Sequence, residues 1–254
     1  MKIAVFIIAA LATYLICAIN PAIVFSKLIY HKDIRQEGSG NPGFSNFNRV
    51  FGMKYAWLVF LLDISKGILL ELLFGWLFAK AFAQTPDSNV WTQWRLFGIA
   101  YSGIFAMLGH TLPIWYKFKG GKGFLVCIST LFLIDWKCGL FAFIMLAILL
   151  LSTHFMSLAT IIAMISGTVL LPFMKVPIIP TLIFALCTLF MIFRHRENIK
   201  RLASGTENKF YFFKKKTEEK AEEEKTEEQT SGEKETEVPT ESEENQTETS
   251  SDEK

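Results

Sequence analysis

The chain has 254 residues, of which 51% are hydrophobic and 14% aromatic, with 24 phenylalanines, a composition that is rich for a soluble domain. Its net charge of +2 is the sum of two parts of the chain with opposite net charge. Segment 214–254 holds 16 acidic residues and 7 lysines, a net of −9, which leaves 8 acidic and 19 basic residues, a net of +11, for the rest. This split predicts a membrane domain, residues 1–212, and a disordered cytoplasmic tail, residues 213–254, rich in Glu, Lys, Thr and Ser.

Seven apolar runs follow one another in the membrane domain: 3–25, 56–79, 96–116, 124–134, 138–151, 155–171 and 176–193. A helix needs roughly 20 residues to cross the hydrocarbon, and two of the middle runs fall short of that length. We therefore expect an all-α integral membrane protein with about seven transmembrane helices. Pro21 lies inside the first run and should kink it. The first run could also be a signal peptide, but no small-residue cleavage site follows it, which favours a transmembrane helix.

The positive charges gather in alternate connections between the runs. The segments 26–55, 117–122 and 194–201 are basic, whereas the intervening connections are close to neutral. Because Lys and Arg mark the cytoplasmic side of a membrane protein, this alternation predicts an outside N-terminus and a cytoplasmic C-terminus. The four cysteines lie scattered in apolar runs, which is typical of small core residues and not of a metal site.

Two glycine-rich basic segments lie on the predicted cytoplasmic side. The first, residues 33–49, combines glycines, hydroxyls, amides and two arginines, and the second is 117–123. Glycine backbone can expose successive N–H groups to an anion, and arginine can hold a phosphate with two hydrogen bonds. The second segment lacks Walker spacing, but it could hold an anion at the start of the next helix. The alternatives are a flexible charged loop and a basic hinge.

Two further clusters carry charge near the membrane. Asp63 and Lys66 lie three residues apart on one face of the second run, where a structural ion pair is favoured over a position of Lys66 near the cytoplasmic site. The last run ends in Arg194-His195-Arg196-Glu197-Asn198. A helix cap would explain a lone histidine, but the neighbouring arginines and amide favour contact with a phosphate or a hydroxyl.

Four motifs in order resemble a known family. They are Gly-Ser-Gly-Asn-Pro-Gly-Phe-Ser-Asn at 38–46 with a later Arg49, Leu-Asp-x-x-Lys-Gly at 62–67, Gly-His-x-x-Pro at 109–113 with Phe-Lys-Gly-Gly-Lys-Gly at 118–123, and Arg-His-x-Glu-Asn-Ile at 194–199. Together they resemble the bacterial acyl-phosphate-dependent glycerol-3-phosphate acyltransferases, the PlsY family, over residues 1–210. The resemblance implies a seven-helix enzyme of the bacterial cell membrane that acylates the 1-hydroxyl of glycerol 3-phosphate and releases lysophosphatidic acid and phosphate, the first step of phospholipid synthesis.

The resemblance also implies the residues of the site. The catalytic positions are Ser39, Arg49, Lys122, His195 and Asn198. Among the substrate-binding positions the resemblance implies Asn46. From the chemistry of the motif segments we also expect substrate binding by Gly38, Gly40, Asn41, Gly43, Ser45, His110, Lys119, Gly120, Gly121, Gly123 and Arg194. The chain departs from the usual family pattern at Phe44-Ser45, at Cys17-Ala18-Ile19-Asn20-Pro21 and at Phe124-Leu125-Val126, which affects substrate geometry more than the reaction.

Acyl phosphate is a mixed anhydride and already activated, so no acyl-enzyme is needed, and we expect direct attack by the glycerol hydroxyl. Either His195 or a substrate phosphate could accept the proton, and the phosphate is favoured because its second pKa lies near neutrality. We expect the two substrates and membrane lipid as partners, with a possible upstream enzyme that forms acyl phosphate, no nucleic acid and no cofactor or metal.

Three other classes are less consistent with the sequence. Acyltransferases that use acyl-CoA commonly carry His-x-x-x-x-Asp, and no histidine here has an aspartate at that spacing. A transporter or flippase for a phosphorylated solute should place its contacts near the bilayer midplane and contain an internal repeat. The sequence shows no such repeat, and its candidate contacts lie at one membrane surface. A structural scaffold leaves the clustered Gly, Ser, Asn and Arg residues unexplained.

Overall fold

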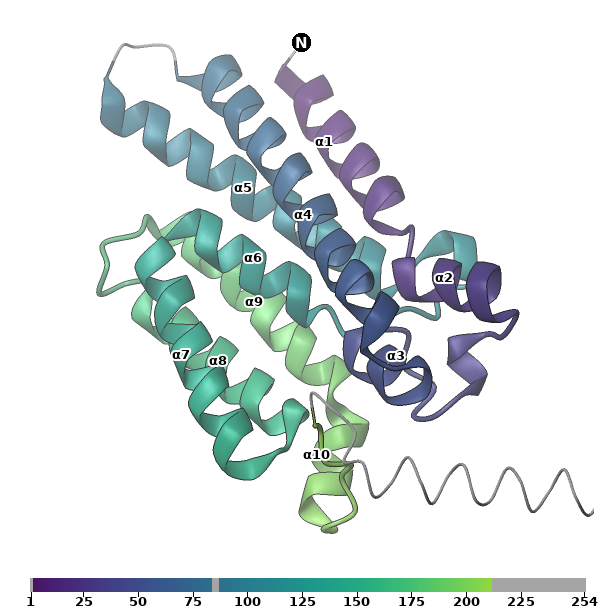
Figure 1. Ribbon diagram of the computed structural model, residues 1–254. Helices are drawn as coiled ribbons and strands as arrows, with labels where there is room; N and C mark the ends of the chain where they lie inside the picture. The colour runs from purple at the N-terminus through teal and green to yellow at the C-terminus, as the bar shows by residue number, and fades with distance from the viewer. Residues whose placement is uncertain (1, 84–86, 212–254) are drawn as a thin grey trace, which may run out of the picture. The chain divides into compact units, whose positions relative to one another are not determined.

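The computed structural model describes residues 2–83 and 87–211, where every regular element is a helix (Figure 1). The predicted all-α class is therefore confirmed for these residues, whereas the predicted tail lies outside them. The elements are α1 (Lys2–Cys17), α2 (Pro21–Tyr30), η1 (Ile34–Gln36), α3 (Phe44–Phe51), α4 (Met53–Phe82), α5 (Ser88–Thr111), η2 (Ile114–Tyr116), α6 (Phe124–Ile134), α7 (Trp136–Thr153), α8 (Met156–Leu170), α9 (Ile178–Arg194) and α10 (Arg196–Ala203).

The first apolar run is broken where the proline predicts a kink. Helix α1 ends at Cys17, and α2 begins at Pro21, which needs no backbone donor in the first turn of a helix. The Asn20 side chain accepts a hydrogen bond of 3.0 Å from the Ile23 N–H and so caps the new helix. After α2 the chain reaches the segment that follows α5, where Arg35 Nη1 donates a hydrogen bond to the Tyr116 carbonyl at 3.1 Å.

The number of spans remains a prediction. Three segments of the described chain are long and apolar enough to cross a membrane, namely Lys2–Tyr30, Ser88–Tyr116 and Trp136–Thr153, and α9 with α10 forms a fourth if this pair, bent by 55°, counts as one. Helices α6 and α8 are shorter, with 11 and 15 residues. Helix α4 has 30 residues, but it carries Asp63, Lys66 and Glu71 in its interior. These lengths and charges explain why the count of seven is not confirmed.

The long helices pack closely through small residues. Helix α4 lies along α5, α1 packs on both, α7 pairs with α8, and α9 packs on α5 (Figure 1). At the crossing of α4 and α5, a Cβ on Gly98 would lie 2.8 Å from the Phe74 carbonyl oxygen and 2.9 Å from the Gly75 Cα. Such backbone proximity is typical of membrane helices, where packing replaces the hydrophobic effect.

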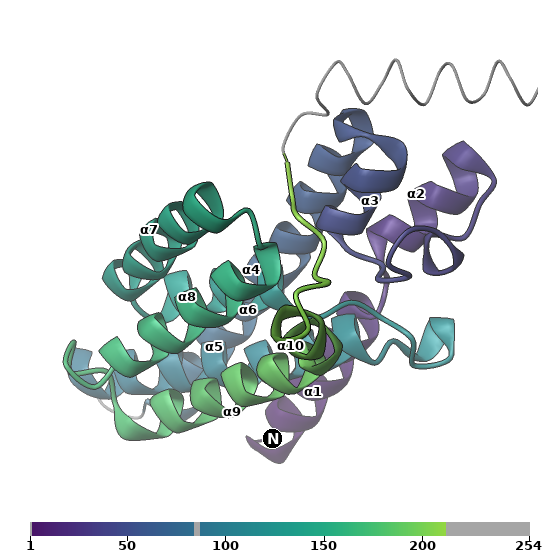
Figure 2. The same ribbon diagram turned by 90° about the horizontal axis from the view of Figure 1, so that it is seen from below.

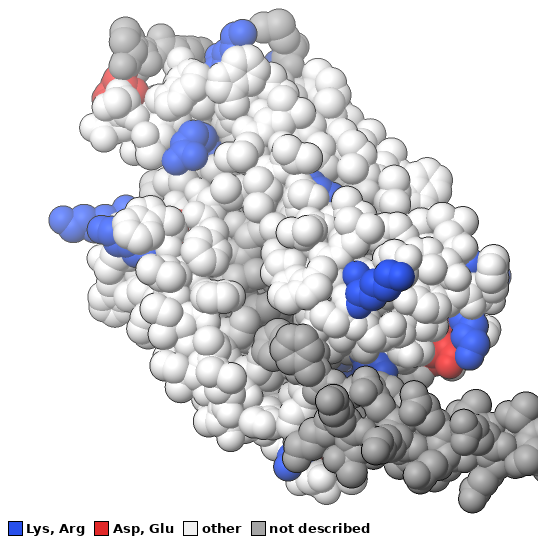
Figure 3. Space-filling model, in the orientation of Figure 1, with Lys and Arg blue, Asp and Glu red and all other residues white. Residues whose placement is uncertain are grey.

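The outer surface of the bundle is apolar. Large side chains such as Leu69, Leu151 and Phe173 are 67%, 71% and 73% exposed. The face drawn in Figure 3 is uncharged over most of its described area, with isolated Lys and Arg side chains. An apolar surface of this extent is expected where helices contact lipid tails.

Residues 205–211, which we call the strap, follow α10 and run back toward α3 (Figure 2). The Phe210 N–H donates a 2.7 Å hydrogen bond to the His154 carbonyl after α7. The Asn48 amide of α3 donates to the Tyr211 carbonyl at 3.3 Å. The strap therefore joins α3 to the α7–α8 connection, close to the end of α9.

Candidate active site

The three predicted motif segments meet around one cavity of about 350 Å³. It is lined by 11 of the residues that the sequence predicts for the site: Ser39, Asn41, Gly43, Ser45, Asn46, Arg49, His110, Lys122, Gly123, His195 and Asn198. All five predicted catalytic positions are among them. The common location agrees with the charge pattern, which assigned the three segments to one side of the membrane.

Asn46 organises the first glycine-rich loop from within. Its buried side chain accepts a 2.8 Å hydrogen bond from the Ser39 N–H and donates to the Glu37 carbonyl at 3.0 Å. Gly38 has φ of +57°, and a Cβ there would lie 2.5 Å from the Asn46 Oδ1, so only glycine fits. Arg49 Nη1 reaches the same oxygen at 3.5 Å. Asn46 thus holds Ser39 and Arg49 toward the cavity.

The second glycine-rich loop is folded tightly onto the end of α5. The Gly121 N–H donates to the His110 carbonyl at 3.1 Å, and a Cβ on Gly121 would collide with the His110 ring nitrogen Nε2. Arg194 Nη2 donates to the Gly120 and Gly121 carbonyls at 3.3 and 3.4 Å. Of these residues only His110 lines the cavity; Gly120, Gly121 and Arg194 fix the loop from outside it. Lys119 is exposed and does not line the cavity either.

Two helices, α3 and α6, begin at the cavity. Gly43 is the N-cap of α3 and Gly123 that of α6, and neither helix has a side-chain cap. The first N–H groups of an uncapped helix lack partners and carry the positive end of the helix dipole. Both glycine caps line the cavity. The arrangement can hold anionic groups at two points.

The cavity walls carry excess positive charge. Burial is the main cause that lowers the pKa of Lys122 to about 8; Glu207 opposes this shift, and Arg201, Arg49 and Arg194 contribute to it. Burial and the Lys122 charge lower the pKa of His195 to about 4, so its imidazole is neutral at neutral pH. A bound anion would compensate this charge.

The geometry also fixes the tautomer of His195. Its Nδ1 lies 2.8 Å from the Met191 carbonyl oxygen. A carbonyl oxygen only accepts hydrogen bonds, so Nδ1 carries the proton and Nε2 has a lone pair. Neutral His195 can therefore accept a hydrogen bond at Nε2 but cannot supply a positive charge.

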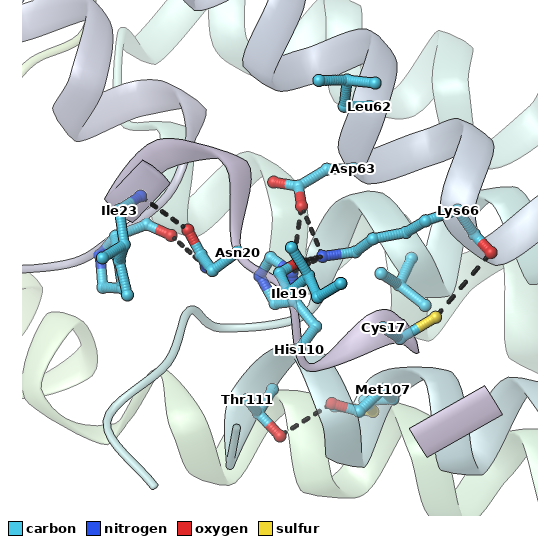
Figure 4. Close-up of polar contacts among 12 residues, drawn as sticks. Cys17, Ile19, Asn20, Ile23, Leu62, Asp63, Lys66, Met107, His110 and Thr111 are labelled. Carbon is cyan, nitrogen blue, oxygen red and sulfur yellow. Dashed lines mark hydrogen bonds and ion pairs between the residues drawn. The ribbon is translucent and has the colours of Figure 1, made fainter. Parts of the chain in front are cut away.

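The predicted pair of Asp63 and Lys66 is confirmed and is part of a larger cluster (Figure 4). Asp63 Oδ1 lies 2.8 Å from Lys66 Nζ and 3.2 Å from His110 Nδ1, and Lys66 also donates to the Ile19 carbonyl at 3.0 Å. Figure 4 shows Asp63 and Lys66 extending from α4 toward His110 on α5. Asp63 and His110 line the cavity. The cluster fixes the His110 ring, against which Gly121 packs.

Sequence reasoning missed several polar residues of the cavity, namely Ser157, Thr160, Arg201, Glu207 and Asn208. Ser157 and Thr160 belong to an apolar run and showed no motif. The strap follows the last predicted helix in a polar stretch, where only Gly205 indicated a turn. Its return to the cavity depends on long-range contacts that no local pattern reveals.

The remaining wall of the cavity is apolar. It is formed by Phe44, Trp57, Phe60, Phe124, Leu125, Phe143, Leu146, Leu150 and Met156. Phe44 lies 5.6 Å from Phe60 and 6.0 Å from Trp57, measured between ring centroids. Phe44 and Phe124, which depart from the family pattern, are therefore part of this wall. The cavity joins an anion site to a surface suited to an acyl chain.

Fold and site thus define an integral membrane protein with a positively charged site at one end of its helices. The sequence model described as glycerol-3-phosphate acyltransferase matches residues 7–205. The glycerol-3-phosphate acyltransferase of Finegoldia magna is 34% identical over 80% of this chain and 95% of its own length. That of Aquifex aeolicus is 35% identical over 78% of this chain and 95% of its own length.

Solved structures give the same result. The crystal structure of PlsY, an integral membrane glycerol 3-phosphate acyltransferase, in its glycerol 3-phosphate form is 31% identical, with a TM-score of 0.71 over 81% of this chain and 96% of that chain. The lysophosphatidic acid form has a TM-score of 0.69 and 30% identity, over 82% and 96%. The chain belongs to the glycerol-3-phosphate acyltransferase family, and its resemblance to the PlsY proteins is confirmed.

Proposed function

We propose that this protein transfers a fatty acyl group from acyl phosphate to the 1-hydroxyl of glycerol 3-phosphate, giving lysophosphatidic acid and phosphate. The observation that carries the proposal is the single cavity in which three segments supply cations and N–H donors next to an apolar wall. Both substrates carry a phosphate, and one of them also carries an acyl chain. Relatives named for glycerol 3-phosphate support the acceptor.

In the proposed reaction the hydroxyl oxygen attacks the acyl carbon directly. A carbon–oxygen ester bond forms, the bond from the acyl carbon to the phosphate oxygen breaks, and phosphate leaves with the electron pair. Arg49 and Lys122 hold the phosphate of the acceptor, and the N–H groups near Gly43 and Gly123 stabilise the acyl-phosphate head and the departing phosphate. Each glycine-rich segment then contacts both phosphates, because its cation binds one and its helix N–H groups bind the other; this division remains part of the proposal.

Direct transfer is supported by the positions of the nucleophilic side chains. The four cysteines, all within described helices, are buried and none lines the cavity. The serines Ser39, Ser45 and Ser157 line the cavity, but among the described residues no histidine is hydrogen-bonded to any of their hydroxyls to activate it; Ser157 donates to Glu207 at 2.7 Å. A mixed anhydride is reactive enough to need no intermediate, so the site mainly neutralises charge and aligns the two substrates.

The proton of the attacking hydroxyl passes to a substrate phosphate oxygen in this proposal. With a pKa of about 4, His195 is a weak base. A phosphate group has a second pKa of about 6 and lies beside the hydroxyl that it would deprotonate. His195 then serves as a neutral hydrogen-bond acceptor that orients glycerol 3-phosphate.

The proposal includes the membrane arrangement. Seven spans, an outside N-terminus and a cytoplasmic C-terminus in a bacterial cell membrane would place the cavity where soluble glycerol 3-phosphate and membrane-dissolved acyl phosphate meet. An upstream enzyme that forms acyl phosphate would supply the donor. No cofactor enters the proposed chemistry.

The experiment compares donors with purified full-length protein in lipid nanodiscs. Glycerol 3-phosphate is incubated with acyl phosphate, acyl-CoA or an acyl carrier protein thioester, and lysophosphatidic acid is measured. We expect product with acyl phosphate alone; product with a thioester instead would contradict the proposed donor. A burst of phosphate equal to the enzyme concentration without glycerol 3-phosphate would reveal an acyl-enzyme and contradict direct transfer.

A further inference from the structure

A carboxylate lies inside the positively charged cavity. Glu207, on the strap, has a side chain only 6% exposed, and it accepts hydrogen bonds from three groups. Ser157 Oγ of α8 donates at 2.7 Å, Asn198 Nδ2 of α10 at 2.6 Å and Arg201 Nε at 2.8 Å. A negative group in a site for two anionic substrates opposes their binding unless it has another task.

Glu207 is ionised at neutral pH. Burial by itself raises the pKa of this carboxyl, but the hydrogen bonds from Asn198, Ser157 and Arg201 more than offset burial and lower the pKa below its usual value. An ionised carboxylate only accepts hydrogen bonds. The atom of Asn198 that faces it must therefore be the NH₂ group, which fixes the orientation of the amide.

The other end of the same amide lacks a partner. Asn198 is 5% exposed, and its Oδ1 makes no hydrogen bond to the described residues, although the residue lines the cavity with Lys122 and His195. Buried acceptors are normally satisfied, so this oxygen indicates a ligand that donates a hydrogen bond. A phosphate dianion has no proton to donate, whereas a hydroxyl has.

We propose that Glu207 orients the Asn198 amide so that Asn198 Oδ1 accepts a hydrogen bond from a hydroxyl of the glycerol moiety, while Lys122 and Arg49 hold the phosphate. This inference rests on the proposed function, because it assigns parts of glycerol 3-phosphate to separate groups. Asn198 is then a binding residue for the hydroxyl, and Glu207 is a positioning residue that acts through it.

The test compares two ligands that differ in their hydroxyl groups. Binding of glycerol 3-phosphate and of inorganic phosphate is measured by calorimetry on the full chain in nanodiscs, and the readout is the ratio of the two affinities. A change in the total charge of the site alters both affinities alike and cancels in the ratio. Asn198→Ala should lower the ratio about tenfold, since one hydrogen bond to the hydroxyl is lost.

The orienting role of Glu207 is tested by a pair of substitutions that conserves charge. In Glu207→Gln the new glutamine amide can either donate a hydrogen bond to Asn198 or accept one from it. The Asn198 amide can therefore adopt the flipped orientation, and the affinity ratio should fall severalfold. In the double variant Asn198→Asp with Glu207→Gln, the new carboxylate can only accept, the glutamine NH₂ donates to it, and the ratio should return to within about threefold of the wild type. Asn89→Ala, at the exposed start of α5, is the control and should leave the ratio unchanged.

The outcomes separate the inference from the function on which it rests. If Asn198→Ala weakens both ligands equally, Asn198 contacts the phosphate and the inference is wrong. A ratio that stays low in the double variant, while Glu207→Gln lowers it, contradicts the orienting role. If Glu207→Gln does not fold, Asn198→Ala still tests the contact with the hydroxyl, and the double variant still tests the orienting role. Wild-type protein that binds inorganic phosphate but not glycerol 3-phosphate would overturn the proposed function itself.

Discussion

The buried Lys122 should make glycerol 3-phosphate binding depend on pH in the range from 7 to 9. Burial, against the opposing charge of Glu207 and with the neighbouring arginines, lowers the pKa of Lys122 to about 8. The protonated ammonium binds the phosphate dianion and the neutral amine does not. Affinity is therefore full well below pH 8 and falls as the pH rises through this value. The ligand stays a dianion throughout, since its own second pKa is about 6.

The magnitude follows from the pKa and Coulomb's law. With a pKa of about 8, Lys122 is protonated in about 90% of the molecules at pH 7 and about 10% at pH 9. A phosphate charge about 4 Å away stabilises the ammonium by roughly 4 kcal/mol at an effective dielectric constant of about 20, which keeps it protonated in the complex. The dissociation constant should then rise about tenfold between pH 7 and pH 9, with uptake of about half a proton per ligand at pH 8.

Calorimetry in two buffers with different ionisation enthalpies measures both the affinity and the proton uptake. Lys122→Arg keeps its charge over the whole range and should remove the alkaline weakening, even if its affinity is lower. Lys119→Arg is the matched control, because Lys119 belongs to the same loop but is exposed outside the cavity. A wild-type affinity that is constant from pH 7 to 9 without proton uptake would refute the reasoning.

Three substitutions test other parts of the site. Gly121→Ala forces a Cβ against the His110 ring and should lower kcat/KM by about 10²-fold. Gly67→Ala is the control and should have little effect, because the nearest side-chain atoms would lie 3.5 Å from the new Cβ. Equal losses in the two variants would contradict the role of the loop. Arg49→Ala should raise KM for glycerol 3-phosphate at least about tenfold, and an unchanged KM would refute its assignment to the phosphate. His195→Gln should keep more than about 1% of kcat if a substrate accepts the proton, whereas a loss of 10²–10⁴-fold with intact binding would indicate that His195 is the base.

The positions of the motif residues could be predicted because their signals are local. Glycines, amides and cations lie within short segments such as 38–49 and 119–123, and the alternation of basic loops indicated that these segments share one side. The break at Pro21 was also predictable, since a proline cannot continue the hydrogen-bonding pattern of a helix. The cavity confirms that these segments meet, as Gly43 and Gly123 both line it.

The rest of the site depends on contacts between distant residues. Glu207 reaches Ser157, 50 positions earlier, only because the strap turns back after α10 toward the α7–α8 connection. Asp63 and Lys66 were paired from their spacing, but the contact of Asp63 with His110 joins two helices and has no local signal. The number of spans was equally hard to predict, because helix length and buried charge oppose each other in α4.

The central claim is that the cavity transfers an acyl group from acyl phosphate to glycerol 3-phosphate. Its most direct test is one time course with purified protein in sealed liposomes that contain acyl phosphate, in which lysophosphatidic acid and phosphate are measured together after glycerol 3-phosphate is added. We predict that the two products form in a 1:1 ratio, that both depend on glycerol 3-phosphate, and that Lys122→Met abolishes both. Uptake of glycerol 3-phosphate into the liposomes without any lipid product would contradict the account and indicate a transporter.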